Sequence, residues 1–273
     1  MKINEYEKQE IIDRILSSSK YRGKGLNPAT IQDLIDQEAE KHRSRKTIRK
    51  AVRRKLHNIV APYLGDPDYE AFLLRLSRIT DSSPNSRQLL SFCQDVLNVH
   101  ASTAERSRNL KNFYHQLFKI TGKPNSILDL ACGIHPLSFP WMDLELSIQY
   151  HAFDIIQTRI DFINSFFKKL GLEPLARNQD ILINPPGFHA DLGFFFKEAH
   201  RFEKRNPGCN KEFFSSLDVD YLAISLPARD LAGKHSLVDH HRDLIIRNLP
   251  TNKGISELLI DDEIIFIVKA PGC

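Results

Sequence analysis

The segment of residues 126–136, SILDLACGIHP, constrains the fold of this chain more than any other stretch. It opens with an apolar run the length of a buried strand in a parallel sheet, and it passes through Asp129 into the small residues Ala131, Cys132 and Gly133. Small residues let a ligand approach the backbone closely, and open α/β sheets bind ligands beyond the carboxyl ends of their strands. The segment therefore predicts a first strand and its ligand loop. The GxGxxG pattern is absent, so a dinucleotide is not indicated.

Strand and helix signals alternate after this segment. The expected elements are a strand at 148–153 ending in Asp154, a helix at 155–170 stopped by Gly171, a short strand region at 175–181, a buried strand at 191–197, a helix around 198–217 broken near 206–208, a strand at 221–226, a part-helical stretch at 234–248, and a hairpin of 255–260 with 263–269. This order predicts an α/β fold with a Rossmann-like, seven-stranded sheet that ends in an antiparallel hairpin.

The strongest charge feature lies in residues 41–55, where nine Lys and Arg side chains occur with no acid among them. Apolar residues recur at helical spacing through residues 48–60, so one face of a basic helix at 41–60 can pack while the others stay cationic. Such a surface binds phosphates by releasing condensed counterions. The candidate nucleic-acid contacts are Lys46, Arg49, Lys50, Arg53 and Arg54. A merely solvated basic helix is the alternative.

The first hundred residues contain helical signals and no convincing strand. Asn27 and Pro28 are typical of an N-cap followed by proline in the first turn, and helices are expected at 68–79 and 85–99. We therefore predict a helical domain at 1–104 and an α/β domain at 105–273. Ser102 or Thr103 is expected to cap the next helix, which would run to Gly122.

Arg106 falls in the first turn of that expected helix, where a cation is unfavourable for the helix dipole. Another partner is therefore expected for it. A carboxylate ligand is one candidate, and a surface salt bridge is the other.

Composition narrows the class of protein. At 41% hydrophobic and 26% charged residues, the chain is typical of a soluble globular protein. Four scattered cysteines without a CxxC pair argue against a zinc site or a disulfide framework, and no metal is predicted. A charged amino-terminal stretch and the lack of a long apolar run indicate no signal peptide and no membrane span, so a cytoplasmic location is expected.

The order Asp-x-Ala-Cys-Gly at 129–133 resembles the first motif of class I S-adenosylmethionine (SAM) methyltransferases. In such a site the Gly133 loop passes near the sulfonium and the amino-acid end, and Asp129 accepts from the ammonium. Asp154 lies about twenty residues beyond Gly133, the spacing of an acid that binds ribose hydroxyls. Asp180 is the candidate acceptor for the adenine amino group, with Ile181 beside it. Each acid also has an alternative role as a cap or a surface acid.

Asn184-Pro185-Pro186 resembles the motif of exocyclic-amine methyltransferases, but it precedes the Asp191 strand instead of ending it, so we interpret it as a loop. A guanine N7 has a free lone pair, and its methylation needs no base. Catalysis would then depend on orientation and electrostatics, and no catalytic residue is assigned.

The chain resembles, more specifically, the aminoglycoside-resistance 16S rRNA methyltransferases of the Arm group, which methylate N7 of guanosine 1405. The residues that carry the resemblance span most of the chain: Lys20-Tyr21, Lys55-Leu56-His57, Ala61-Pro62-Tyr63, HASTAER at 100–106, LDLACGIHP at 128–136, Phe196-Lys197, and ISLPAR at 224–229. The block at 102–106 is the most specific of these, because generic methyltransferases lack it.

The resemblance implies that Arg106 holds the SAM carboxylate and that Lys197 lines the cofactor pocket. It also makes Lys197 and Arg229 candidate helpers on the target side, and it implies that the helical domain docks on 16S rRNA within the assembled 30S subunit. A monomer is expected on the same ground. After Arg229 the family usually has Gly-Arg and then Gly-Met, whereas this chain has Gly233-Lys234-His235, so Lys234 would keep only the charge.

The function that this resemblance implies is SAM-dependent methylation of guanine 1405 at N7, conferring aminoglycoside resistance. Two alternatives remain open: a methyltransferase for another rRNA or tRNA nucleotide, and a catalytically silent protein that binds SAM and rRNA.

Overall fold

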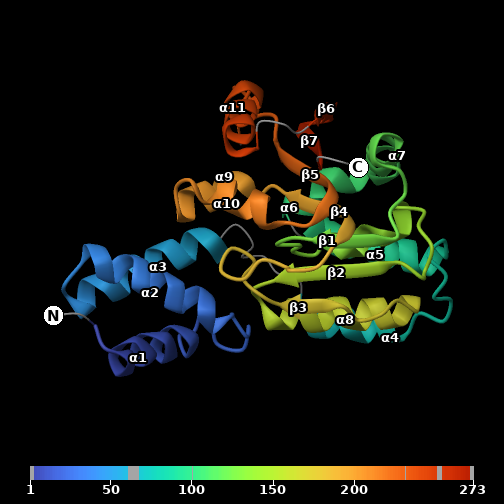
Figure 1. Ribbon diagram of the computed structural model, residues 1–273. Coiled ribbons are helices and arrows are strands. Elements are labelled where there is room, and N and C mark those ends of the chain that lie inside the picture. The colour runs from blue at the N-terminus through green and yellow to red at the C-terminus, as the bar shows by residue number, and fades with distance from the viewer. Residues whose placement is uncertain (1–2, 61–67, 100, 231, 251–253, 271–273) are drawn as a thin grey trace.

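The computed structural model describes residues 3–60, 68–99, 101–230, 232–250 and 254–270. Its centre is a seven-stranded sheet of order β3-β2-β1-β4-β5-β7-β6 (Figure 1). β1 to β5 run parallel, and β7 is antiparallel to both of its neighbours, β5 and β6. The strands are β1 (Ser126–Asp129), β2 (Gln149–Asp154), β3 (Ala176–Asn178), β4 (Ala190–Phe196), β5 (Val219–Pro227), β6 (Gly254–Ile260) and β7 (Glu263–Lys269). The predicted sheet and its closing hairpin are confirmed.

Helices cover both faces of the sheet, because successive residues of a buried strand point to opposite sides. Ile127 belongs to one hydrophobic cluster and Leu128 to the other. The first face is covered by α4 (Tyr69–Ser77), α5 (Arg87–Val99), α7 (Leu110–Thr121), the 3₁₀ segment η3 (His135–Trp141) and α8 (Gln157–Leu170). The second is covered by α9 (Ala199–Arg205), α10 (Cys209–Ser216) and α11 (Val238–Asn248). Gly171 ends α8 in the left-handed conformation, as predicted.

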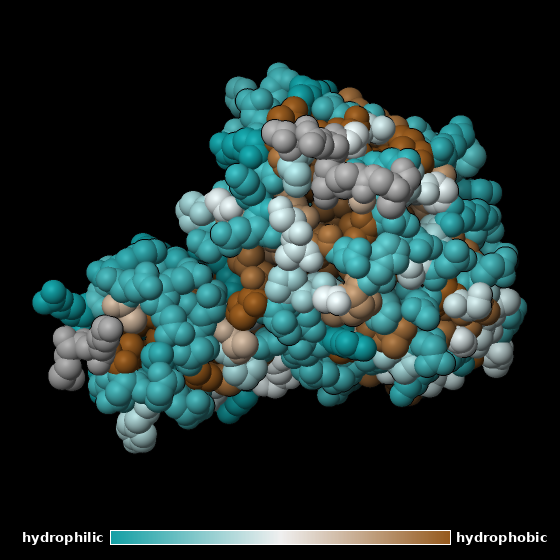
Figure 2. Space-filling view, viewed as in Figure 1, coloured by the Kyte–Doolittle hydropathy of each residue, from teal (hydrophilic) through white to brown (hydrophobic). Residues whose placement is uncertain are grey.

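Three amino-terminal helices form a smaller lobe with its own hydrophobic cluster (Figure 1). They are α1 (Glu5–Leu16), α2 (Pro28–Lys41) and α3 (Arg45–Val60). The predicted cap of α2 is confirmed, since the Asn27 side chain accepts a hydrogen bond from the Ala29 amide at 2.9 Å. Hydrophilic side chains dominate the visible surface of this lobe, and brown hydrophobic side chains gather where it meets the larger body (Figure 2).

The predicted domain boundary at residue 104 stays a prediction, and observations in residues 68–122 bear on it and on the expected start of the next helix. Leu76, Leu89 and Phe92 of α4 and α5 share one cluster with strand residues such as Ile127, so these helices pack on the sheet. The hydrophobic clusters therefore do not separate at the predicted boundary of residue 104. The chain around Arg106 also forms the short helix α6 (Ala101–Ala104) and the 3₁₀ turn η2 (Arg106–Arg108) before α7.

The capping expectation for this stretch was wrong. Asn109 precedes α7, and its side chain makes no capping hydrogen bond. Thr103 lies within α6, where its hydroxyl donates to the Leu97 carbonyl at 2.7 Å. The Thr103 hydroxyl thus bonds to a carbonyl of α5 instead of capping the next helix. None of the helices within the described segments is long and apolar enough to cross a bilayer.

A backbone seam joins the small lobe to the sheet directly beyond β2. Leu26 forms an isolated antiparallel bridge with Ile156, the Asn27 amide donates to the Ile155 carbonyl at 2.8 Å, and the Gln157 amide donates to the Gly25 carbonyl at 3.0 Å. The lobe is therefore fixed to the residues that follow Asp154.

Candidate functional site

The loop after β1 turns sharply at the carboxyl edge of the sheet. Ala131 and Gly133 both have positive φ, 54° and 55°, a region that a residue with a Cβ rarely adopts. The Leu130 amide donates to the Phe194 carbonyl and the Cys132 amide to the Phe153 carbonyl, each at 2.8 Å, so the loop is fixed between β4 and β2. It therefore presents its backbone to the space beyond the strands, as the sequence predicts.

Asp154 ends β2 and is held by three donors. Its Oδ2 accepts from the Gly133 amide at 3.1 Å and from Arg159 Nη1 at 2.7 Å, while Oδ1 accepts from the Ile156 amide at 2.9 Å. A carboxylate oxygen accepts about two hydrogen bonds, so Oδ1 can take one more donor. The spacing identified this acid, but the sequence analysis missed Arg159, which orients it from α8.

Asp129 belongs to a buried hydrogen-bonded network under the loop. Its Oδ2 bonds His135 Nδ1 at 2.7 Å and accepts from the Tyr150 hydroxyl at 2.8 Å. The other ring nitrogen of His135 lies 2.6 Å from the Tyr114 hydroxyl. An imidazole that donates from Nδ1 to the carboxylate and accepts at Nε2 from the phenol would satisfy both contacts. His135, Tyr114 and Tyr150 were not found from the sequence.

Arg106 is buried among residues of the sheet and its flanking helices, and it lines one of the cavities at the carboxyl edge. Its guanidinium pairs with both carboxylate oxygens of Glu263 at the start of β7, and Nη2 donates to the Ser225 hydroxyl at 3.3 Å. The Phe113 and Phe196 rings each lie 4.3 Å from the guanidinium carbon, measured to the ring centroid. A cation between two ring faces is held by their quadrupoles as well as by the acid.

The Arg106–Glu263 pair corrects one expectation, because this salt bridge is buried and does not lie on the surface. Burial alone would raise the pKa of Glu263, but the charges of Arg106 and Lys197 more than offset it, so that pKa lies below its ordinary value. Glu263 therefore stays ionised and keeps the guanidinium in place.

Lys197 lies at the junction of β4 and α9 with φ of 61°. Its side chain is buried, and Nζ donates to Glu105 Oε2 at 2.6 Å. Its backbone amide donates to the Ser225 carbonyl at 2.8 Å. The block at 102–106 thus supplies both Arg106 and the partner of Lys197.

Asp180 connects the sheet edge to the small lobe. It accepts from the Thr30 hydroxyl at 2.6 Å, from Arg205 Nη1 at 2.7 and 3.0 Å to its two oxygens, and from the Leu182 amide at 3.2 Å. Arg205 also donates to Asp33 of α2 at 2.7 Å. The contacts to Asp180 fill the acceptor capacity of the carboxylate, so its predicted contact with adenine stays a prediction.

Two small cavities follow the carboxyl edge and share Ala131 in their walls, and we call them together the edge cleft. One is lined by residues that include Arg106, Asp129, Gly133 and Lys197. The other is lined by residues that include Asp154, Ile155, Asp180 and Ile181. The fold brings all seven predicted cofactor residues, which are spread over residues 106–197, to this cleft: Arg106, Asp129, Gly133, Asp154, Asp180, Ile181 and Lys197.

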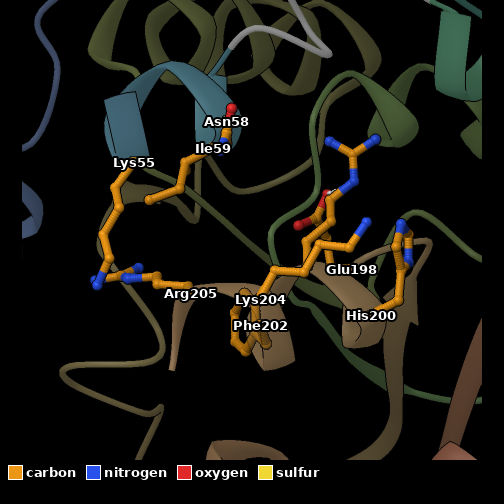
Figure 3. Close-up of a pocket in the computed structure, with 9 residues that line it drawn as sticks. Lys55, Asn58, Ile59, Glu198, His200, Phe202, Lys204 and Arg205 are labelled. Carbon is orange, nitrogen blue, oxygen red and sulfur yellow. Dashed lines mark ion pairs between the residues drawn. The ribbon is translucent and has the colours of Figure 1, made fainter. Parts of the chain in front are cut away.

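Two larger spaces open beside the edge cleft. The basic cleft, of about 460 Å³, lies between α3 and α9, with Lys55, Asn58 and Ile59 facing Lys204 and Arg205 (Figure 3). The loop groove, of about 1080 Å³, is lined by residues of α9, by residues of 227–230 and 232–237, and by α11. Lys197 lines both the edge cleft and the loop groove, so the two spaces adjoin.

Comparison with known proteins decides the family. The family model described as "Ribosomal RNA methyltransferase (FmrO)" matches residues 17–256. The chain belongs to this family.

Curated and solved relatives agree with the FmrO family assignment over nearly the full length. A 16S rRNA (guanine(1405)-N(7))-methyltransferase of Proteus mirabilis is 26% identical, over 98% of this chain and 99% of that protein. The 16S rRNA methylase RmtB is 27% identical with a TM-score of 0.79, covering 96% of this chain and 98% of the other. The 16S rRNA methyltransferase RmtF, solved with S-adenosyl-L-homocysteine, is 24% identical with a TM-score of 0.80, covering 98% and 99% of the two chains, and shows the same fold.

In this FmrO-family protein, α3 carries the predicted basic surface. Three of the nine cations in residues 41–55 have acidic partners: Arg45 pairs with Glu7 and Glu10, and both Lys41 and Lys55 pair with Glu38. Within the described segments, the five predicted RNA contacts have no acidic partner; four are exposed and Arg49 is half-buried: Lys46, Arg49, Lys50, Arg53 and Arg54. These five cations are therefore available to an anionic ligand, and their contact with RNA stays a prediction.

Arg229 and Lys234 lie on the loop that borders the loop groove. Arg229 is exposed, donates to the Gly233 carbonyl at 3.3 Å, and lies 3.4 Å from Asp262. The Lys234 side chain is exposed, and its backbone amide donates to Asp230 at 2.8 Å. Both cations therefore face solvent where a large ligand can reach them.

Two other features lie outside the edge cleft. Asn184-Pro185-Pro186 lies in the loop between β3 and β4, as interpreted from the sequence. Among the described residues, His189, Asp191 and Asp220 bring their ligand atoms within 4.8 Å of one another. They lie at the amino ends of β4 and β5, the opposite edge of the sheet, and Asp191 already accepts from the Asn125 amide at 2.6 Å. We assign this group no role.

Proposed function

We propose that this protein methylates N7 of guanine 1405 in 16S rRNA, with SAM as methyl donor, and thereby confers aminoglycoside resistance. The observation that carries the proposal is the junction of an edge cleft lined by Arg106 and Asp154 with two open, cation-lined spaces. The name of the Proteus mirabilis relative supports the target nucleotide. We further propose that a cytoplasmic monomer acts on the assembled 30S subunit.

The residues of the edge cleft fit SAM. The Arg106 guanidinium suits the carboxylate, because Glu263 fixes its plane while the cavity remains on its free side. Asp154 Oδ1 retains an acceptor position for a ribose hydroxyl. Ile155 and Ile181 line the same cavity as Asp154 and would offer apolar surface to the adenine, and Asp129, which lines the other cavity, would accept from the ammonium.

SAM, when bound, supplies an electrophilic methyl group on a sulfonium. A guanine N7 attacks with a lone pair that is already free, so the protein has no proton to remove. The work of the chain is therefore to orient the two partners in line and to exclude water. Lys197, held by Glu105 between the edge cleft and the loop groove, would stabilise the oxygen-bearing edge of the guanine, and Arg229 would hold RNA at the mouth of the groove.

The small lobe would dock on folded rRNA through α3. Its unpaired cations lie on the element that also forms one wall of the basic cleft. Docking there would place the RNA beside α9 and the edge cleft. The proposed docking domain thus includes α1 to α3.

The test is methyl transfer from labelled SAM to purified 30S subunits of a drug-sensitive bacterium, with the modified nucleotide mapped by primer extension and mass spectrometry. We expect one N7-methylguanosine at position 1405, together with growth of expressing cells on gentamicin and kanamycin. A label at another nucleotide of rRNA or tRNA would show that the protein is a methyltransferase with a different target nucleotide. Binding of SAM and 30S without any label would favour the silent binder.

A further inference from the structure

Glu198 is the N-cap residue of α9, but its side chain does not cap the helix. The helix has no side-chain cap hydrogen bond. The side chain is only 9% exposed, and Oε1 accepts no hydrogen bond from any residue that the structure describes. Its nearest cation is Arg201, whose Nε lies 3.8 Å away, beyond hydrogen-bond distance. A buried carboxylate oxygen without a donor is costly and calls for a partner.

Glu198 lies in the wall that separates the edge cleft from the basic cleft. It lines both spaces, and Figure 3 shows its carboxylate on the α9 side of the basic cleft, across from Ile59 and Asn58 of α3. Its chain neighbour Lys197 lines the part of the edge cleft around Arg106, whereas Glu198 does not. The carboxylate therefore belongs to the wall of the cavity around Asp154 and of the basic cleft, and not to the cavity that the Gly133 loop lines.

Two cations of α9 lie near Glu198 and could contact RNA. Arg201 and Lys204 line both the basic cleft and the loop groove. They can hold backbone phosphates on either side of a base directed at Glu198. Two other acids line the same part of the edge cleft. Asp180 is already filled by Thr30, Arg205 and a backbone amide, and the open position of Asp154 is the one proposed for the ribose of the cofactor. Glu198 is therefore the acceptor left for a ligand.

We propose that Glu198 recognises the target base as guanine, by accepting hydrogen bonds from its N1–H and its 2-amino group. The inference rests on the proposed function, which it deepens by naming the residue that selects the base. A guanine presents two adjacent donors on this edge, and a carboxylate accepts both, whereas an adenine presents an acceptor at N1 and no amino group at C2.

The position of these donors suits transfer to N7. N1 and the 2-amino group lie on the edge of the purine opposite N7, so a base held by Glu198 leaves its N7 lone pair free. That lone pair then faces away from α9's first turn and toward the loop side of the edge cleft.

Burial raises the pKa of Glu198 to about 7, although Arg201 lowers it in part. At pH 8 the buried, ionised carboxylate therefore lowers the free energy of unfolding of the free protein. This destabilisation disappears below the ordinary pKa of glutamate, where the carboxyl is protonated in both the folded and the unfolded state. Replacement by Gln removes the buried charge, so Glu198→Gln is expected to be at least as stable as the parent at pH 8. A loss of activity in this variant is then not a loss of fold.

The experiment compares the parent, Glu198→Gln and the control Glu212→Gln, an exposed acid on α10. Single-turnover methyl transfer at pH 8 is measured on affinity-tagged 30S subunits that carry either the natural target guanine or an adenine in its place. Equilibrium binding of S-adenosyl-L-homocysteine and of 30S subunits is measured in parallel. Thermal unfolding confirms that each variant is folded.

We expect Glu198→Gln to lower the rate on guanine subunits at least tenfold and to narrow the guanine-to-adenine rate ratio. Its binding of S-adenosyl-L-homocysteine and of 30S should stay within about twofold, and Glu212→Gln should match the parent throughout. Equal rates for Glu198→Gln and the parent would overturn the inference, as would equal losses on both subunits. A tenfold loss of S-adenosyl-L-homocysteine binding would instead assign the acid to the cofactor. Failure of the parent to methylate guanine subunits would concern the proposed function and not Glu198.

Discussion

At one end of the edge cleft, Arg106 is enclosed by the sheet and its flanking helices alone, whereas at the other end Asp180 is enclosed by side chains from two units. Glu263, Ser225 and two aromatic rings hold the Arg106 end. Thr30 of the small lobe and Arg205, itself tied to Asp33, hold the Asp180 end. The Arg106 end is thus closed by the larger body alone, whereas the closure of the Asp180 end depends on the small lobe, so we expect only the Asp180 end to respond to the position of that lobe.

The largest effect is expected from Arg106→Ala. It leaves Glu263 buried without its partner, and breaking a buried pair in this way lowers the free energy of unfolding by about 3–5 kcal/mol. Urea denaturation measures the change, and binding of S-adenosyl-L-homocysteine should fall at least tenfold. Arg108→Ala, an exposed neighbour on the same turn, is the control. Equal stability of the two variants would show that the Arg106 end is not self-contained.

Charge reversal on α3 should affect RNA and leave the cofactor alone. Arg49→Glu, Arg53→Glu and Arg54→Glu together should weaken 30S binding by about tenfold to a hundredfold, and the slope of log affinity against log salt should flatten by about 0.7–0.9 per lost phosphate contact. Filter binding across a salt series measures both. Reversal of three exposed lysines of the larger body, Lys111, Lys168 and Lys211, makes the same change in net charge and should have a smaller effect. An unchanged salt slope would make α3 a solvated face.

Asp154→Asn tests the proposed ribose contact, in the part of the edge cleft that Asp154 shares with Asp180. The amide keeps the size of the side chain but loses charge-assisted hydrogen bonds, which are worth about 1–3 kcal/mol. Calorimetric binding of S-adenosyl-L-homocysteine should weaken by that amount. The exposed Asp161→Asn on α8 is the matched control. Affinity equal to the control's would refute the ribose role.

The smallest effect should come from Thr30→Val, which removes one hydrogen bond to Asp180 from the small lobe. A single neutral donor lost from a carboxylate costs about 1 kcal/mol or somewhat more. If the Asp180 end senses the lobe, cofactor affinity should fall slightly in the free protein, whereas Thr47→Val on the exposed side of α3 should leave it unchanged. An increase in affinity would mean that the lobe restrains this end instead of supporting it.

The sequence predicted the elements and positions that depend on residues close together in the chain. The apolar run at 126–130, the acid about twenty residues beyond Gly133 and the proline after Asn27 each depend on neighbours in the chain, and each was confirmed as an element or a position in the fold. The basic helix was also visible, because unpaired cations at helical spacing need no distant partner to be recognised.

The partners of the site residues were not predictable in the same way. Arg106 meets Glu263 across 157 positions, and Asp180 meets Thr30 across 150. No periodicity connects such residues, and the only signal for Glu263 was an acid opening an apolar final strand. For the same reason the boundary at residue 104 followed helix content, whereas burial groups α4 and α5 with the sheet.

The backbone seam that joins the small lobe to the sheet depends on a glycine at position 25. Its φ is +60°, and a Cβ built there would lie 2.5 Å from the Cβ of Gln157. Any other residue would have to push the start of α8 away, and with it the turn that follows Asp154. A homologue could thus retain every motif that contacts methyl donor or RNA and still be inactive through one substitution in a turn with no chemistry of its own. Surveys that judge resistance from catalytic motifs alone would count such a gene as functional, and position 25 is where they should look first.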